Sequence, residues 1–140
     1  MTAATTEIAN ESAIYAMVLG RVICSLREER GLNQTQLAEA LGLTQSGLSR
    51  IERGATVPDA YVLRRLAEAL GLDPRELTGH VEKAMQRTQK AAEAAAPHGA
   101  KEAWWSAALK VASVTGFAGL VAFAVAVALH EDRRPEAKSK

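Results

Sequence analysis

The stretch Gly31–Gly54, GLNQTQLAEALGLTQSGLSRIERG, restricts the possible folds of this chain more than any other segment. Its apolar residues recur at helical spacing in two short runs, first Leu37, Ala38 and Leu41, then Leu48 and Ile51. This spacing predicts two short amphipathic helices. Gly42 lies between them and predicts a sharp turn, because a left-handed backbone would be strained for other residues. The segment therefore predicts a helix-turn-helix.

Caps and stops predict three more helices around this motif, one over residues 14–30, one after Pro58-Asp59 and one after Asp73-Pro74. Side chains that accept hydrogen bonds cap helix starts, and glycine ends helices. The expected caps and stops within the domain are Gly31, Asn33, Thr44, Gly54 and Gly71. Roughly a dozen inward Leu, Ile and Val side chains suffice for a small core. We expect an all-α, five-helix domain over residues 14–79.

The charge of this domain is balanced, because residues 15–79 contain eight Arg and eight acidic residues. A neutral domain should bind phosphate weakly as a monomer, so dimerisation or tethering would have to strengthen any binding to nucleic acid. Cys24 is the one cysteine in the chain, which excludes an intrachain disulfide and agrees with a reducing compartment. We expect Cys24 to be a packing residue.

The residues of the motif carry a resemblance to a known family. They are Arg27, Gln34, Gln36, Leu37, Ala38, Gly42, Thr44, Gln45, Ser46, Leu48, Ser49, Ile51, Glu52, Arg53 and Gly54, with LxxLAxALGLDPxEL from Leu63 to Leu77 downstream. Over roughly residues 19–79 the chain closely resembles the phage-repressor and Cro (XRE-type) helix-turn-helix domains. The resemblance implies double-stranded DNA as partner, with the helix after Thr44 in the major groove.

The outer face of that helix is hydrophilic. Gln can pair with adenine and Arg with guanine, each contributing roughly 1–3 kcal/mol of discrimination. The candidates for base reading are Thr44, Gln45, Ser46, Ser49 and Arg50. The resemblance implies DNA phosphate contacts at Gln34, Arg53 and Thr56, and it implies a structural ion pair between Arg27 and Glu52. Gly47 costs roughly 1 kcal/mol relative to Ala; it indicates either close approach to DNA or a slightly frayed surface helix.

A second apolar segment, Val111–Leu129, has nineteen residues without a charge. As a helix it would measure roughly 28 Å, close to the hydrocarbon thickness of a bilayer. Trp104 and Trp105 before it and two Arg after it suit interface anchors. We expect a single transmembrane helix within residues 104–130; the alternative is an oligomerisation helix in a soluble protein. DNA binding requires the first domain in the cytoplasm, whereas the Lys and Arg balance mildly favours the opposite orientation.

The remaining segments complete the predicted organisation. We expect residues 1–13 to be a disordered arm, residues 80–103 a helical linker interrupted at Pro97-His98-Gly99, and residues 131–140 a charged tail. Small residues at four-residue spacing within Val111–Leu129 favour a homodimer, and so does a weak heptad of small residues. Its members are Leu77, Val81, Ala84, Thr88, Ala91 and Ala95.

No pattern in the chain indicates catalysis. His80, His98 and His130 lack the spacing of metal ligands, and no phosphate loop or nucleophile–base pair is present. We expect neither an enzyme nor a metal or cofactor. The leading hypothesis is a sequence-specific transcription regulator, a repressor, tethered to the bacterial inner membrane. The alternatives are a membrane-anchored adaptor that uses this fold for protein contact, like the N-terminal part of a bacterial cell-shape protein, and an antitoxin-like soluble repressor whose apolar helix binds a partner.

Overall fold

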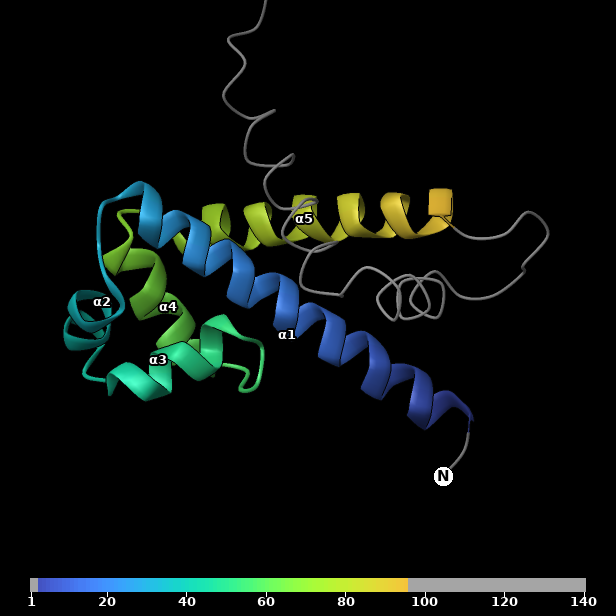
Figure 1. The fold of residues 1–140 in the computed structure, drawn as a ribbon, viewed down its shortest axis with the longest axis horizontal. Helices are drawn as coiled ribbons and strands as arrows, with labels where there is room; N and C mark the ends of the chain where they lie inside the picture. Colours follow the sequence, from blue (N-terminus) through green and yellow to red (C-terminus); the bar gives the residue numbers. More distant parts are fainter. Residues whose placement is uncertain (1–2, 96–140) are drawn as a thin grey trace, which may run out of the picture.

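Five helices make up the part of the chain that the computed structural model describes, residues 3–95. They are α1 (Ala3–Glu29), α2 (Gln34–Leu41), α3 (Gln45–Glu52), α4 (Ala60–Ala69) and α5 (Pro74–Ala95). No strand occurs over these residues, which confirms the all-α prediction there. The three short helices gather beside the C-terminal half of α1, and α5 crosses α1 as a second long helix (Figure 1).

The starts of the short helices follow from local hydrogen bonds. The Asn33 side chain accepts a bond of 2.8 Å from the backbone N–H of Gln36, whose own side chain accepts from the backbone of Asn33 at 2.9 Å. Thr44 caps α3 and Asp59 caps α4 through one bond each, in which the side-chain oxygen accepts from the backbone N–H of Gly47 and of Val62. Between α2 and α3, Gly42 has φ +69°, which confirms the predicted left-handed turn. The caps and the turn therefore lie where local chemistry predicted them.

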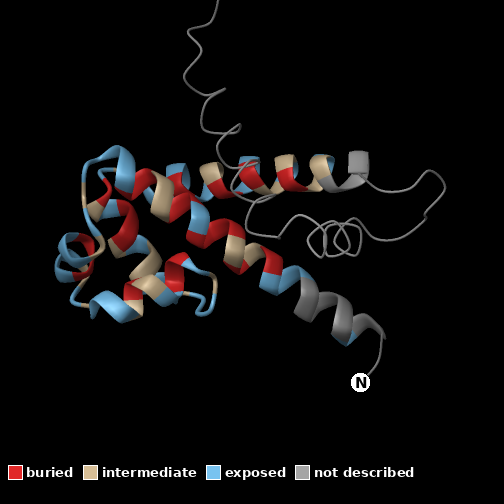
Figure 2. Ribbon diagram, in the orientation of Figure 1, coloured by how far each residue is buried: buried red, intermediate tan, exposed pale blue. Residues whose placement is uncertain are grey.

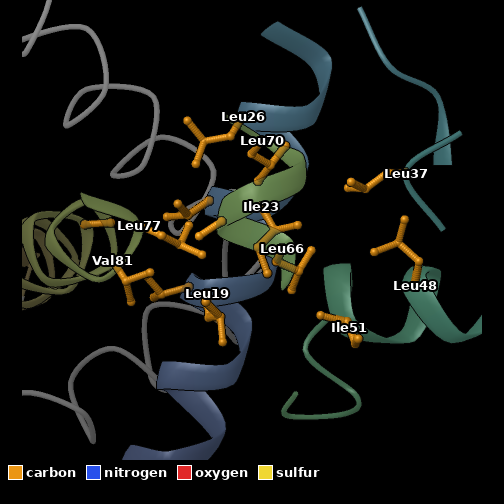
Figure 3. Packing of buried hydrophobic residues seen from close by; sticks show 14 of the residues in the cluster. Leu19, Ile23, Leu26, Leu37, Leu48, Ile51, Leu66, Leu70, Leu77 and Val81 are labelled. Atoms are coloured by element: carbon orange, nitrogen blue, oxygen red, sulfur yellow. The ribbon is translucent and has the colours of Figure 1, made fainter. Parts of the chain in front are cut away.

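The core lies between the long helices and the three short ones. Figure 2 shows the buried residues along the facing sides of the helices, and Figure 3 shows their side chains converging. All five helices contribute to this cluster: Ile14, Val18, Leu19, Val22, Ile23 and Leu26 from α1, Leu37 and Ala38 from α2, Leu48 and Ile51 from α3, Leu66 and Ala67 from α4 with Leu70 directly after it, and Leu77, Val81 and Ala84 from α5. Leu48 and Ile51 thereby fix which side of α3 faces outward.

The first helix is longer than the sequence indicated. α1 begins at Ala3 rather than near Ile14, so the expected disordered arm is not found over residues 3–13. This segment has no Gly or Pro to stop a helix. Once a helix is nucleated by the packed residues from Ile14 onward, each further residue adds a backbone hydrogen bond at little cost.

The last helix also crosses an expected boundary. α5 continues from Pro74 to Ala95, whereas the sequence predicts a change from domain to linker after residue 79. Val81, Ala84 and Thr88 in the linker part are buried, and α5 packs on α1 and α4. The weak heptad is therefore covered, at least as far as Thr88, by the same chain and gives no support for a homodimer. A stripe at this spacing marks a buried face without showing which helix covers it.

Several predictions concern residues outside the described range. These are the interruption at Pro97-His98-Gly99, the transmembrane segment over residues 104–130 and the charged tail over residues 131–140. Among the helices of residues 3–95, none combines the length and apolarity that crossing a membrane requires.

Candidate nucleic-acid interface

One side of α3 is anchored in the core and the other faces solvent. Leu48, Ile51 and Glu52 are buried. Of the residues predicted to read bases, Thr44, Gln45, Ser46 and Arg50 are exposed and Ser49 is half-buried. Thr44 has a structural task as well, because its hydroxyl accepts a bond of 3.0 Å from the backbone N–H of Gly47. The solvent face of α3 thus offers amide, hydroxyl and guanidinium groups.

The residues predicted to bind phosphate lie at the two ends of α3. Gln34, the first residue of α2, is hydrogen-bonded to Gln45 at the N-terminal end of α3. Arg53 follows the last turn of α3, where its side chain donates to the Ser49 carbonyl at 3.4 Å, and Thr56 is exposed in the loop that follows. Side chains at both ends of a helix that lies in a DNA groove are suited to contact the two phosphate backbones that flank the groove.

A buried ion pair ties α3 to α1, as the resemblance implied. Arg27 Nε donates to Glu52 Oε1 at 2.7 Å and Arg27 Nη2 donates to Oε2 at 3.2 Å. Each residue is 8% exposed. The hydrogen bonds to Glu52 hold the pKa of Arg27 above its usual value. A third bond, from Nη1 to the Leu32 carbonyl at 2.8 Å, extends the connection to the turn before α2.

The same carboxylate reaches two more residues that sequence reasoning left unconnected. Glu52 Oε2 accepts from Gln34 Nε2 at 2.8 Å, and Gln34 Oε1 accepts from Gln45 Nε2 at 2.7 Å. A continuous path of hydrogen bonds therefore runs from buried Arg27 to exposed Gln45. These partners are 25, 18 and 11 residues apart in the chain. No local pattern predicts such bonds, because they form only when α1, α2 and α3 pack together.

Two glycines let α1 approach the C-terminal end of α3. A Cβ atom on Gly20 would lie 2.4 Å from the Ile51 carbonyl oxygen and 2.5 Å from that of Glu52. A Cβ on Gly54 would lie 2.7 Å from the Cα of Met17, and Gly54 also has φ +74°. Sequence reasoning missed Gly20; a lone glycine inside a long run of helix formers was the signal available.

The presence of glycine at position 47 has a local structural explanation, in addition to close approach to DNA and a slightly frayed surface helix. It lies in the first turn of α3, and a Cβ there would lie 3.0 Å from the Thr44 hydroxyl oxygen that caps the helix. The cap itself holds the Gly47 N–H. Glycine therefore leaves room for the capping hydroxyl at the end of α3 that carries the candidate reading residues.

A surface pocket of about 320 Å³ lies beside α3. Residues of α3, α4 and the segments before and between them line it: Leu43, Gly47, Arg50, Ile51, Thr56, Val57, Pro58, Asp59 and Val62. Val57 is 54% exposed there. Over residues 3–95 no group of His, Cys, Asp and Glu is placed to hold a metal ion.

Comparison with known proteins places this geometry in a family. A helix-turn-helix family model matches residues 25–77, which include all of α2, α3 and α4. The HTH-type transcriptional regulator YazB of Bacillus subtilis, itself uncharacterized, is 37% identical over 62 residues, which cover 90% of YazB and 44% of this chain. The chain belongs to the helix-turn-helix family. Within it, α2 and α3 are the two helices of the motif.

Two proteins of Bacillus phage phi105 are also similar. The ImmF control region 10 kDa protein is 42% identical over 55 residues, which cover 39% of this chain. The immunity repressor protein is 40% identical over 63 residues, which cover 45% of this chain. The chain spans 61% of the length of the first and 44% of the second. No solved structure matches the chain significantly.

Proposed function

We propose that this protein is a sequence-specific DNA-binding transcription regulator, and that it acts as a repressor. The observation that carries the proposal is the division of α3, whose inner face is held by Leu48 and Ile51 while its outer face presents Gln45, Ser46 and Arg50 to solvent. A helix with an anchored inner face and hydrogen-bonding outer side chains suits the major groove. The names of the phage repressor and of YazB support the same assignment.

Phosphate contacts would fix α3 in register on the duplex. Gln34 at one end of α3, and Arg53 and Thr56 at the other, are our candidates for these contacts. Eight Arg against eight acidic residues over 15–79 leave no net charge to attract DNA at a distance. We therefore propose that two copies bind together, each reading a half-site about one helical turn (roughly 34 Å) from the other. Repression would follow from covering a promoter.

Selection from random DNA tests the proposal directly. Fragments that bind the purified chain would be sequenced, and gel shifts would compare the wild type with the double variant Gln45→Ala, Arg50→Ala. We expect the double variant to lose about tenfold or more of its preference for the selected site, since each base contact contributes roughly 1–3 kcal/mol. The matched control is Arg75→Ala, Gln86→Ala, which removes the same side chains from exposed positions on α5.

Two results would contradict the proposal that the protein is a DNA-binding regulator. One is normal binding by the double variant, and the other is the absence of any enriched fragment. Either result would favour the adaptor hypothesis, in which the same fold contacts a protein.

We propose further, from the sequence, that Val111–Leu129 anchors the regulator in the bacterial inner membrane with the helix-turn-helix in the cytoplasm. The nineteen uncharged residues and the Trp pair before them support this anchor. Carbonate extraction of membranes would compare the full chain with a variant lacking residues 104–140. We expect the full chain alone to resist extraction. Release of the full chain would favour the antitoxin-like alternative, with the apolar helix covered by a partner.

A further inference from the structure

The loop between α3 and α4 places an apolar side chain beside the outer face of α3. Val57 is 54% exposed and borders the surface pocket next to α3. Gly47 and Arg50 of α3 line the same pocket, as does Thr56, the residue before Val57. Arg50 is a candidate base reader and Thr56 a candidate phosphate contact. The exposed side of Val57 therefore lies among residues that we propose to contact DNA.

The pocket is mainly apolar. Its apolar lining comes from the turn before α3, from α3 itself and from the segment around the start of α4: Leu43, Ile51, Val57, Pro58 and Val62. Of these side chains, that of Val57 is exposed and the others are half-buried or buried. Apolar surface that is exposed to water gains free energy when an apolar group covers it. The pocket thus favours an apolar group of the DNA over a phosphate.

Val57 is held in a restricted conformation before anything binds. It precedes Pro58, and a proline ring limits the backbone of the residue before it to extended conformations. Its branched Cβ also restricts the rotation of the side chain. A side chain that is already ordered loses little conformational entropy on contact. Val57 is therefore suited to contact a small, rigid group.

The major groove presents an apolar group of this kind, the 5-methyl group of thymine. This methyl group lies at the end of the pyrimidine edge that is nearest the backbone of its own strand. A side chain that adjoins both a base reader and a phosphate contact is placed to meet it, and Val57 adjoins Arg50 and Thr56 in this way. The side chain of Val57 has no polar atom that could bind phosphate instead.

We propose that Val57 is a specificity-determining residue that contacts the 5-methyl group of a thymine in each half-site, so that T·A is favoured over C·G at that pair. This inference rests on the proposed function and adds a base-reading residue outside α3. A methyl group is uncharged and forms no strong hydrogen bond. The effect of Val57 should therefore follow the methyl group alone, whichever pyrimidine carries it.

The test exchanges single methyl groups on the DNA. Each thymine of the selected site is replaced in turn by uracil, which lacks the 5-methyl group, and gel shifts with the full chain give the dissociation constants. We expect at least one thymine in each half-site where uracil weakens wild-type binding about three- to fivefold, as burial of one methyl group implies. In Val57→Ser the same exchange should change binding by less than about 1.5-fold, because the apolar contact is absent.

The reverse exchange adds a methyl group to another base. Cytosine and 5-methylcytosine are compared at the thymine position that the uracil series identifies. We expect 5-methylcytosine to strengthen wild-type binding about three- to fivefold relative to cytosine, and to leave the binding of Val57→Ser unchanged. Because both bases present the same hydrogen-bonding groups, this comparison isolates the methyl contact.

Two controls separate this contact from other effects. Tyr61→Ser removes the second exposed large apolar side chain of the described residues, which is 67% exposed and does not line the pocket. It should keep the wild-type ratio of thymine to uracil affinities. Thr56→Ala removes a candidate phosphate contact from the same loop. It should weaken binding to the thymine and uracil duplexes by the same factor.

The outcomes are distinct. Uracil effects of equal size in the wild type and in Val57→Ser at every thymine overturn this inference and leave the proposed function intact, and so does a wild type that is insensitive to every methyl exchange. Val57→Ser could instead abolish joint binding of two copies and keep the thymine-to-uracil ratios. The pocket would then pair two copies of the chain, and the inference is overturned. Absence of any selected site overturns the proposed function and this inference with it.

Discussion

Two ion pairs of similar geometry show how burial decides the importance of a residue. Arg27 Nε lies 2.7 Å from Glu52 Oε1 and Arg64 Nε lies 2.8 Å from Glu68 Oε1. The side chain of Glu52 is 4% exposed and that of Glu68 is 42% exposed. Water can replace the partner of an exposed charge, whereas a buried charge that loses its partner has no such replacement. The two glutamates should therefore differ greatly when they are truncated.

We predict that Glu52→Ala lowers the free energy of unfolding by about 3–5 kcal/mol, because Arg27 is left as a buried charge without its carboxylate. Glu68→Ala is the matched control and should cost about 1 kcal/mol or less. Urea denaturation followed by circular dichroism measures both. Equal losses in the two variants would show that the Arg27–Glu52 pair is solvated.

Cys24 should be an unreactive thiol. Burial raises its pKa to about 11 from an ordinary 9.0, and the carboxylates of Glu52 and Glu28 contribute. Alkylation requires the thiolate, so iodoacetamide at pH 8 should label the native chain on the order of ten times or more slowly than the urea-unfolded chain. Equal labelling rates would contradict the assignment of Cys24 to packing.

The same shift gives stability a pH dependence with a defined sign. Above its ordinary pKa of 9.0 the unfolded chain loses the Cys24 proton, while the folded chain retains it up to about pH 11. The unfolded state then binds fewer protons, so stability falls as the pH rises through this window. Urea titrations from pH 8 to 11 should show a steeper fall for the wild type than for Cys24→Ala. Parallel curves would contradict this prediction.

At the level of the elements, a glycine in α1 allows this helix to pack closely against the C-terminal end of α3. Gly20 lies in the middle of α1, where a Cβ would collide with backbone carbonyl oxygens of Ile51 and Glu52. Backbone atoms cannot turn aside as the end of a flexible side chain can. The position of α3, and with it the direction of its outer face, thus depends on the absence of one methyl group.

We predict that Gly20→Ala lowers the free energy of unfolding by about 1–3 kcal/mol, because the two helices must separate to admit the methyl group. Gly79→Ala is the control, since Gly79 is also helical and a Cβ there meets nothing within 4 Å. Helix propensity should make this second variant about 0.5–1 kcal/mol more stable than the wild type. Urea denaturation of both variants measures the difference. A gain in stability at Gly20 would contradict the close packing of α1 on α3, and a loss at Gly79 would contradict the open space beside that residue.

Across the whole of residues 3–95, the folded unit extends beyond residue 79, where the sequence predicts that the domain ends. Leu77, Val81, Ala84 and Thr88 form one buried stripe along α5. α5 packs on α1, and Figure 2 shows buried residues along both helices. Both long helices therefore belong to the core that supports α2, α3 and α4, and the unit does not end at residue 79.

We predict that a chain of residues 1–95 unfolds in one cooperative transition, and that a chain of residues 1–79 is less stable by at least about 2 kcal/mol. The shorter chain lacks Val81 and Ala84 and leaves part of the core uncovered. Urea denaturation of the two chains provides the comparison. Equal midpoints would show that the second half of α5 adds nothing to the core.

The sequence predicted the short helices well because their ends are set by neighbours. Asn33 and Gln36 are three residues apart, as are Thr44 and Gly47, and their hydrogen bonds form within a single turn. The turn at Gly42 is equally local. The length of α1 was missed for a related reason, since nothing in residues 3–13 stops a helix and only its packed continuation makes one stable.

By itself, then, the sequence determined the helix-turn-helix, its caps and the set of polar residues around α3, because each depends on side chains within a few positions of one another. Tertiary structure alone decided that the stripe on α5 faces α1, that Gly20 meets the end of α3, and that Glu52 is joined to Gln45 through Gln34. Those groups are far apart along the chain. Their contacts exist only because burial of the shared apolar core brings the helices together.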